Sequence, residues 1–111
     1  MKHFVSLNKN RDFLRAYKKG QSAVTPCLAL YIRRSGRPVN RMGITVSKKV
    51  GGAVQRNRAK RVLRAAFSAL APSLKAGYDF VLVARTVTPA KKTQEIYHDL
   101  YGIAVQSGLL K

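Results

Sequence analysis

Acidic residues are scarce in this sequence. Its 111 residues include 4 Asp or Glu against 22 Lys or Arg, so the formal net charge is +18. The stretch between Asp12 and Asp79 holds fifteen basic residues and no carboxylate. A nuclease that holds two metal ions needs clustered carboxylates, and four scattered acids do not supply them. We therefore expect no catalytic residue and no metal ligand in this chain, and a polyanion as its partner.

Tryptophan, cysteine and long apolar runs are also missing or rare. The sequence has no Trp and a single cysteine, Cys27, which excludes an intrachain disulfide. No apolar run approaches the roughly 18 residues of a membrane-spanning helix, and a basic helix without Trp anchors is a poor membrane binder. The first residues lack the continuous apolar core of a signal peptide. We expect a cytoplasmic protein that binds nucleic acid and no membrane.

At this length and without repeats or linkers, the chain is expected to form a single domain over residues 1–111. The patterns predict an extended arm over 1–7, a helix capped by Asn8 or Asn10, and a left-handed glycine stop at Gly20. Strands follow over 23–34 and 39–47, paired as an antiparallel hairpin, and Pro26 leaves room for a separate short strand over 21–24. A helix from about 55 to 70, a buried central strand over 78–85 and a last helix capped by Thr93 complete an α+β domain.

The segment 47–70, SKKVGGAVQRNRAKRVLRAAFSAL, carries seven Lys or Arg and no acid. From about Gln55 its apolar residues recur with the spacing of a helix that buries one face. The opposite face has no Glu to pair with its cations, and like charges four residues apart repel, as at Arg56, Lys60 and Arg64. A solvated surface helix normally mixes charge signs. This face therefore indicates a binding surface for a polyanion.

Three aromatic residues are candidates for binding single-stranded RNA. Phe13 and Tyr17 lie four residues apart on one helix face, a spacing that a core pair would also have. Tyr31 lies on the strand face opposite Leu28, Leu30 and Ile32, beside a cation, Arg33. Aromatic side chains interleaved with cations stack on bases without sequence preference. Both interpretations, core and ligand platform, remain open for the helical pair.

A metal-independent ribonuclease could use His3 and His98 as acid and base. His3 falls in the predicted arm and His98 in the last helix, and lone histidines are more often structural or exposed. We consider this alternative weaker than RNA binding without catalysis.

The motif SKKVGGAVQRNRAKRVLRAAF, with DFLRAYKKG before it and GYDFVLVAR after it, resembles the bacterial ribonuclease P protein subunit family. The match covers nearly the whole chain in the family's order. Gly52, Ala65 and Ser68 depart from it where charged residues are common, outside the RNR core. The resemblance implies an α/β sandwich of order αβββαβα, with a four-stranded sheet and a left-handed crossover through the basic helix.

The resemblance also implies a division of labour. In this family a separate catalytic RNA subunit with Mg²⁺ hydrolyses the phosphodiester that joins the 5′ leader to precursor tRNA, and the protein binds that RNA and the leader. No obligate protein partner is evident. A generic RNA-binding or ribosome-associated protein without a processing role is the alternative. By position, the RNA-subunit contacts would be Arg56, Asn57, Arg58, Lys60, Arg61 and Arg64, and the leader cleft would hold Phe13, Tyr17 and Tyr31 with Lys48 and Lys49 nearby.

Overall fold

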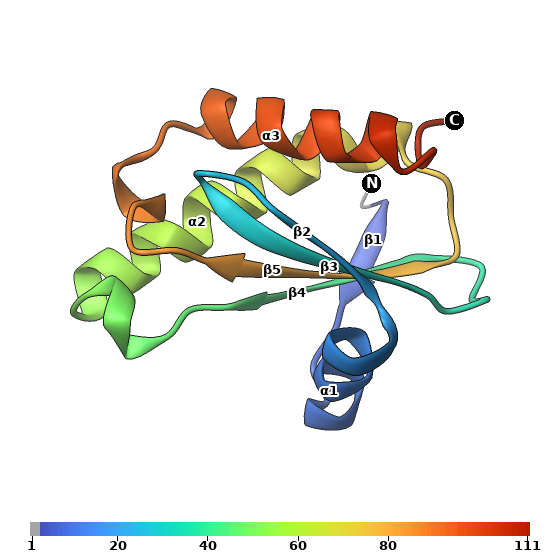
Figure 1. The fold of residues 1–111 in the computed structure, drawn as a ribbon, viewed down its shortest axis with the longest axis horizontal. Coiled ribbons are helices and arrows are strands. Elements are labelled where there is room, and N and C mark those ends of the chain that lie inside the picture. The colour runs from blue at the N-terminus through green and yellow to red at the C-terminus, as the bar shows by residue number, and fades with distance from the viewer. Residues whose placement is uncertain (1–2) are drawn as a thin grey trace.

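The fold is a mixed sheet with helices on both sides, and the computed structural model describes residues 3–111. Along the chain the elements are β1 (Phe4–Ser6), α1 (Asn10–Lys19), β2 (Gln21–Val24), β3 (Leu28–Arg34), β4 (Asn40–Thr45), α2 (Ala53–Leu70), β5 (Tyr78–Ala84) and α3 (Thr93–Gln106). Short 3-10 turns occur at η1 (Lys48–Val50), η2 (Ala71–Ser73) and η3 (Thr88–Ala90). In Figure 1, α1 lies on one side of the sheet, and α2 and α3 lie on the other. The predicted α+β class is confirmed.

The sheet has five strands in the order β1-β4-β5-β3-β2. The expected count of four was too low because β1, predicted as an arm, pairs in parallel with β4. The order therefore begins with a strand, not with a helix. Residues 1–2 of the predicted arm lie outside the described residues.

The predicted hairpin between residues 23–34 and 39–47 is wrong. β5 lies between the two strands, antiparallel to β3, with Ile32 opposite Phe80, and parallel to β4, with Met42 opposite Phe80. β5 is buried along nearly its whole length, and the centre of the sheet is where such a strand hides both faces. β3 forms its hairpin with β2 instead, the separate short strand that Pro26 left room for.

Two parallel strands, β4 and β5, are joined by α2, as the crossover connection between parallel neighbours requires. The predicted helix and its apolar stripe are confirmed: Ala59, Leu63, Ala66, Phe67 and Leu70 are buried. The left-handedness of this crossover stays an expectation from the resemblance.

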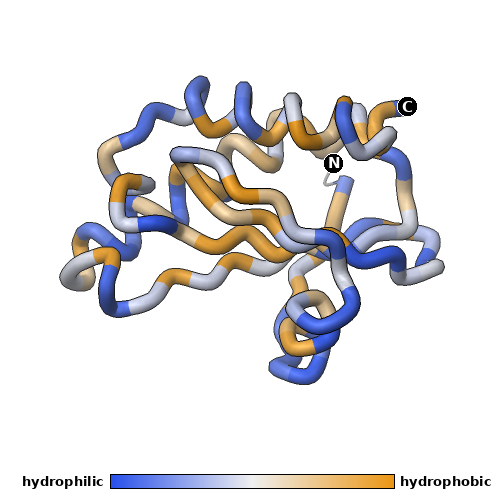
Figure 2. Tube along the Cα trace, viewed as in Figure 1, coloured by the Kyte–Doolittle hydropathy of each residue, from blue (hydrophilic) through white to orange (hydrophobic). Residues whose placement is uncertain are grey.

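The main core fills the space between the sheet and the two helices α2 and α3. Phe67 of α2 contacts Phe80 of β5 at a ring-centroid distance of 5.2 Å, and Phe4 of β1 at 5.0 Å. Ile96 and Leu100 of α3 are also buried in this cluster. Figure 2 shows the same division, with hydrophobic residues along the central strands and hydrophilic residues in the outer loops. This core holds α2 with its charged side turned outward.

The ends of the helices differ from the prediction. α1 begins after Lys9 with no side-chain cap, so neither Asn8 nor Asn10 is the cap. Thr93 is the first helical residue of α3, and the Glu95 carboxylate accepts a hydrogen bond from the Lys92 backbone N–H at 3.0 Å. Gly20 ends α1 in an extended conformation (φ −81°). A Cβ there would lie 2.5 Å from the Ala16 carbonyl oxygen, so the glycine allows a close approach.

Candidate nucleic-acid interface

The outer side of α2 carries cations without compensating acids. Arg58, Lys60, Arg61 and Arg64 are exposed, and so is Asn57, whereas Arg56 is half-buried. No ion pair formed by the described residues involves α2. The helix contains no Asp or Glu, so its positive charge is fully available to an external anion.

The cations of α2 point in different directions. Arg58 donates from Nε to the Pro89 carbonyl at 2.8 Å and so ties α2 to η3. Lys60 and Arg64 line a cavity on another flank of the helix. The Nε of Arg56 is buried and has no hydrogen-bond partner among the described residues. The six predicted contact residues therefore do not form one flat surface.

Phe13, Tyr17 and Tyr31 come together between α1 and the sheet. All three are half-buried and pack against a small second cluster of Leu7, Ala16 and Val81. The rings of Tyr17 and Tyr31 meet edge to face at a centroid distance of 4.9 Å and an interplanar angle of 79°. The Tyr17 hydroxyl lies 2.9 Å from Oγ1 of Thr45, within hydrogen-bond distance. Each ring thus has one side in a core and another side at the surface.

Gly43 is what brings Phe13 onto the sheet. A Cβ at Gly43 would lie 2.5 Å from Cζ of Phe13 and 3.2 Å from Cβ of Leu7. The Phe13 ring therefore rests directly on the backbone of β4. We did not single out Gly43 from the sequence, although a glycine inside a strand commonly marks such a close approach.

Lys48 and Lys49 are exposed in η1, which follows β4 closely. Thr45, the last residue of β4, is within hydrogen-bond distance of the Tyr17 hydroxyl. The turn ends at Gly51, whose φ of +144° favours glycine. The two lysines therefore lie a few residues beyond the end of β4 that contacts the aromatic group.

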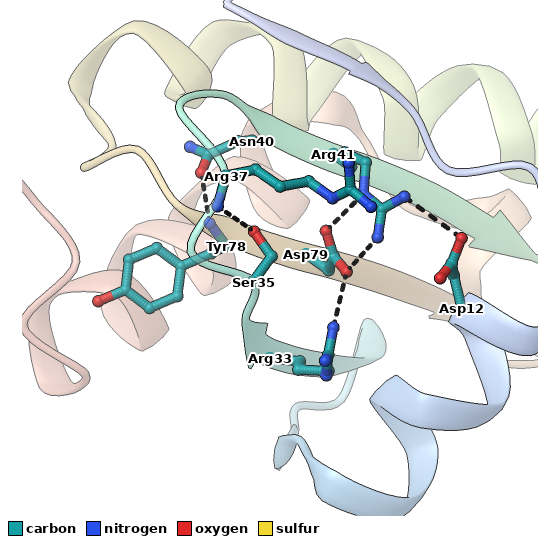
Figure 3. A network of polar contacts seen from close by, with 8 residues as sticks. All are labelled: Asp12, Arg33, Ser35, Arg37, Asn40, Arg41, Tyr78 and Asp79. Atoms are coloured by element: carbon teal, nitrogen blue, oxygen red, sulfur yellow. Dashed lines mark hydrogen bonds and ion pairs between the residues drawn. The ribbon is translucent and has the colours of Figure 1, made fainter.

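An ion-pair network lies on the same face of the sheet as the aromatic group, two residues further along each strand, and Figure 3 shows its members. Asp79 of β5 is fully buried and accepts two hydrogen bonds from Arg41 of β4, at 2.8 and 2.7 Å, with Arg33 of β3 at 3.5 Å. Arg41 also donates to Asp12 of α1 at 3.2 Å. The network joins α1 to three adjacent strands. Sequence reasoning missed it; the signal was an aspartate inside an otherwise apolar strand, since a buried charge needs a partner.

The network shifts the pKa values of its members. The hydrogen bonds of Arg41 to Asp79 raise the pKa of the guanidinium, although burial opposes them. Burial acts to raise the pKa of Asp12, but the charge and hydrogen bond of Arg41 outweigh it and hold that pKa below its ordinary value. The Asp12 carboxylate is therefore charged at neutral pH and is neutralised by Arg41. The remaining acids, Glu95 and Asp99, are on α3, across the sheet from α1.

The structure does not bring the two histidines to a common cavity. His98 is exposed on α3, and His3 is exposed beside β1. Among the described residues, His3 lines two cavities and His98 lines another. No residue of the cavity at His98 lines either cavity at His3. Burial, followed by the nearby Asp99, raises the pKa of Cys27 to about 11, so this thiol is a poor nucleophile at neutral pH.

Neither a metal cluster nor a membrane span is found over residues 3–111. No group of three or more His, Cys, Asp or Glu side chains in this range could hold a metal ion. None of the helices in the same range is long and apolar enough to cross a membrane.

Comparison with known proteins gives one consistent result. The family model described as Ribonuclease P matches residues 1–106. The ribonuclease P protein component of Clostridium acetobutylicum is 37% identical over 106 residues, covering 94% of this chain and 89% of the relative. That of Oceanobacillus iheyensis is 38% identical over 112 aligned positions, covering 100% of this chain and 93% of the relative.

Solved structures agree with the sequence relatives. The RNase P protein of Staphylococcus aureus superposes with a TM-score of 0.81 at 31% identity, over 96% of this chain and 97% of that one. The protein of Thermotoga maritima superposes with a TM-score of 0.77 at 27% identity, over 88% and 93% of the two chains. The basic helix α2 lies on one face of the five-stranded sheet and the aromatic group on the other. With relatives that match almost end to end, this chain belongs to the ribonuclease P protein family, the protein subunits of an RNA-based endoribonuclease.

Proposed function

We propose that this chain binds the catalytic RNA subunit of ribonuclease P through the cations of α2, and holds the 5′ leader of precursor tRNA on Phe13, Tyr17 and Tyr31. Lys48 and Lys49 attract the leader's phosphates from η1. The chemistry belongs to the RNA subunit, and the protein contributes affinity and position. The observation that carries this proposal is the half-buried aromatic group on the side of the sheet where no carboxylate is free.

Charge distribution supports the assignment to RNA. Asp12 and Asp79 are neutralised by arginines, and Glu95 and Asp99 lie on α3. A polyanion that approaches from the side of α1 therefore meets no unpaired acid. Arginine forks pair with phosphate through two parallel hydrogen bonds, and Arg61 and Arg64 are exposed for such contacts.

Geometry supports the leader assignment. Phe13 and the tyrosine pair are fixed by packing and by the Tyr17–Thr45 hydrogen bond, so they bind bases with little loss of conformational freedom. Stacking tolerates any base, which suits a leader whose sequence differs between substrates. Stacking on a rigid surface is a common way for proteins to hold single-stranded RNA.

Magnesium fits the RNA better than it fits this chain. Mg²⁺ prefers carboxylate and phosphate oxygens in octahedral geometry, and two of the four carboxylates here are committed to arginines. The described side chains do not fit a resident Mg²⁺ ion, so we propose that the holoenzyme holds it mainly through RNA phosphates.

Replacing Phe13 by Ala tests the leader assignment. We expect the holoenzyme to bind leader-bearing precursor tRNA about tenfold more weakly, since stacking contributes ~1–3 kcal/mol per base, and to bind mature tRNA unchanged. Leu14→Ala is the matched control, because Leu14 is the next residue on α1 and is 47% exposed. Equal weakening of both ligands would contradict the proposal and favour a generic RNA-binding role.

A further inference from the structure

The first turns of α2 extend beyond the core. Residues 53–55 are exposed, and Ala59 is the first buried residue of the helix. Gly52 precedes the helix and supplies no side-chain cap to its unpaired N–H groups. In Figure 1 these turns reach past the end of β5. The buried stripe of α2 therefore begins only after Arg56 and Asn57, two of the predicted RNA contacts.

A single side-chain hydrogen bond among the described residues joins α2 to another element. Nε of Arg58 donates to the Pro89 carbonyl of η3 at 2.8 Å. The first turn of α2 contains no acid, and the helix dipole disfavours cations near a helix N-terminus. Without a link to the rest of the domain, this end of the helix would fray. The bond from Arg58 to η3 opposes that fraying.

The turn η3 is a firm anchor, because Thr88 is fully buried and all of its polar groups are bonded. Its hydroxyl donates to the Cys27 carbonyl at 2.6 Å and accepts a bond from the Arg85 backbone N–H at 2.8 Å. Its backbone N–H and carbonyl bond to Arg85 and Lys91, both at 3.0 Å. We call the series from Cys27 through Thr88 and Pro89 to Arg58 the η3 strut. It connects the start of β3 to the RNA-binding end of α2.

We infer that Arg58 is a positioning residue, which holds the RNA-binding end of α2 in place through the η3 strut and does not itself contact an RNA phosphate. The inference rests on the proposed function and changes the role of one α2 residue within it. The Nε donor of Arg58 is committed to a carbonyl of its own chain, whereas Arg61 is exposed on the outer side of the helix. A surface that is already ordered loses less conformational freedom on binding. The strut therefore raises the affinity for the RNA subunit without adding a contact.

The test compares Arg58→Ala, Thr88→Val and Arg61→Ala in the holoenzyme reconstituted with its RNA subunit. The affinity of the protein for the RNA subunit is measured at several salt concentrations. Each phosphate contact contributes about 0.7–0.9 to the slope of log affinity against log salt. Thr88 is fully buried and cannot touch RNA, and valine keeps its shape without the hydroxyl.

Two controls separate the strut from general stability. Thr88→Ser keeps the hydroxyl and therefore the bond to the Cys27 carbonyl. Ile96→Val is a buried change in α3, which should cost about 0.5–1.5 kcal/mol of stability. Both variants should bind the RNA subunit as the unmodified protein does.

We expect Arg58→Ala and Thr88→Val each to weaken RNA-subunit binding about fivefold to tenfold with an unchanged salt slope, because the same phosphates are contacted once the helix end is ordered. Arg61→Ala should reduce the slope by about 0.7–0.9, the value of one phosphate contact. Combining Arg58→Ala with Thr88→Val should cost little more than either change alone, because both break the same strut.

Two results would overturn the inference. A slope reduced by Arg58→Ala as much as by Arg61→Ala would make Arg58 a phosphate contact. Unchanged affinity in Arg58→Ala, or in folded Thr88→Val, would show that the strut does not support the RNA-binding end of α2. If Thr88→Val does not fold, the slope of Arg58→Ala decides alone. Failure of the proposed function looks different, because Arg61→Ala would then change neither affinity nor slope.

Discussion

Asp79 is a fully buried carboxylate that accepts hydrogen bonds from two arginines of neighbouring strands. Replacing it with Asn keeps the shape but leaves Arg33 without its counter-charge and Arg41 with Asp12 alone. We expect Asp79→Asn to lower the free energy of unfolding by about 3 kcal/mol, the lower end for breaking a buried pair. Urea denaturation measures this change.

Glu95→Gln is the control for Asp79→Asn. Glu95 is exposed and its ion pair with Lys91 spans 3.7 Å, and such surface pairs contribute about 0–1 kcal/mol. If both variants had the stability of the unmodified protein, the network would not be the structural support that its geometry indicates.

Gly43 is the second residue whose role depends on a contact. Gly43→Ala places a methyl group 2.5 Å from the Phe13 ring, so the ring must move. We expect leader-bearing precursor tRNA to bind this variant about as weakly as Phe13→Ala, and stability to fall by about 1–3 kcal/mol, as overpacking does. Binding and denaturation assays measure the two effects.

Gly102→Ala is the contrast for Gly43→Ala. A Cβ at Gly102 meets nothing within 4 Å, and the residue is inside α3. Alanine there should stabilise the protein by about 0.5–1 kcal/mol through helix propensity, without any effect on the leader. A Gly43→Ala variant with normal leader binding would contradict the placement of Phe13 on β4.

Single residues were predicted from sequence as far as their chemistry is local. The aromatic side chains and cations could be named because stacking and phosphate binding depend on residue type. The Asp79 network and the Gly43 contact could not be derived, because each depends on which strand lies beside which. Gly20 shows the same limit: the residue was right, but it serves a close approach to the Ala16 and Ile32 carbonyls instead of a left-handed turn.

At the scale of elements, α1 is held to the sheet by the pair of Asp12 and Arg41, in addition to its small apolar cluster. The folded pKa of Asp12 lies below its unfolded value. Its stabilisation is therefore complete above the unfolded pKa of about 3.9, and is lost as pH falls through the lower folded value.

We accordingly expect the urea midpoint of the unmodified protein to fall more steeply below about pH 4 than the midpoint of Asp12→Asn, which cannot titrate at this position. The two curves should converge in acid and separate at neutral pH, with the variant less stable. Parallel curves over the whole range would show that Asp12 does not fasten α1.

Elements with a strong period were predictable, whereas their neighbours in the sheet were not. The spacing of Ala59, Leu63 and Phe67 defines the buried stripe of α2, and the structure confirms it. The alternation within β3 and β4 identifies each strand but not its partner, and β5 inserts between them. β1 has only three residues, too few for a period to be visible.

For the whole molecule, the excess positive charge of 22 basic against 4 acidic residues is distributed unevenly over the surface. Two of the acids are neutralised by arginines beside the aromatic group and the other two lie on α3, so the side with α1, η1 and the flank of α2 is left cationic. Composition could predict a polyanionic partner, and the resemblance named it. Only the arrangement in space distinguishes the cavity lined by Lys60 and Arg64 from the outward side of α2.

We propose that the protein positions RNA and that the RNA subunit performs the chemistry. The most direct measurement is cleavage of precursor tRNA by the purified protein alone, by the protein with its RNA subunit and Mg²⁺, and by the same mixture without Mg²⁺. We expect a mature 5′ end only when protein, RNA subunit and Mg²⁺ are combined under near-physiological salt. Cleavage at that position by the protein alone would contradict it.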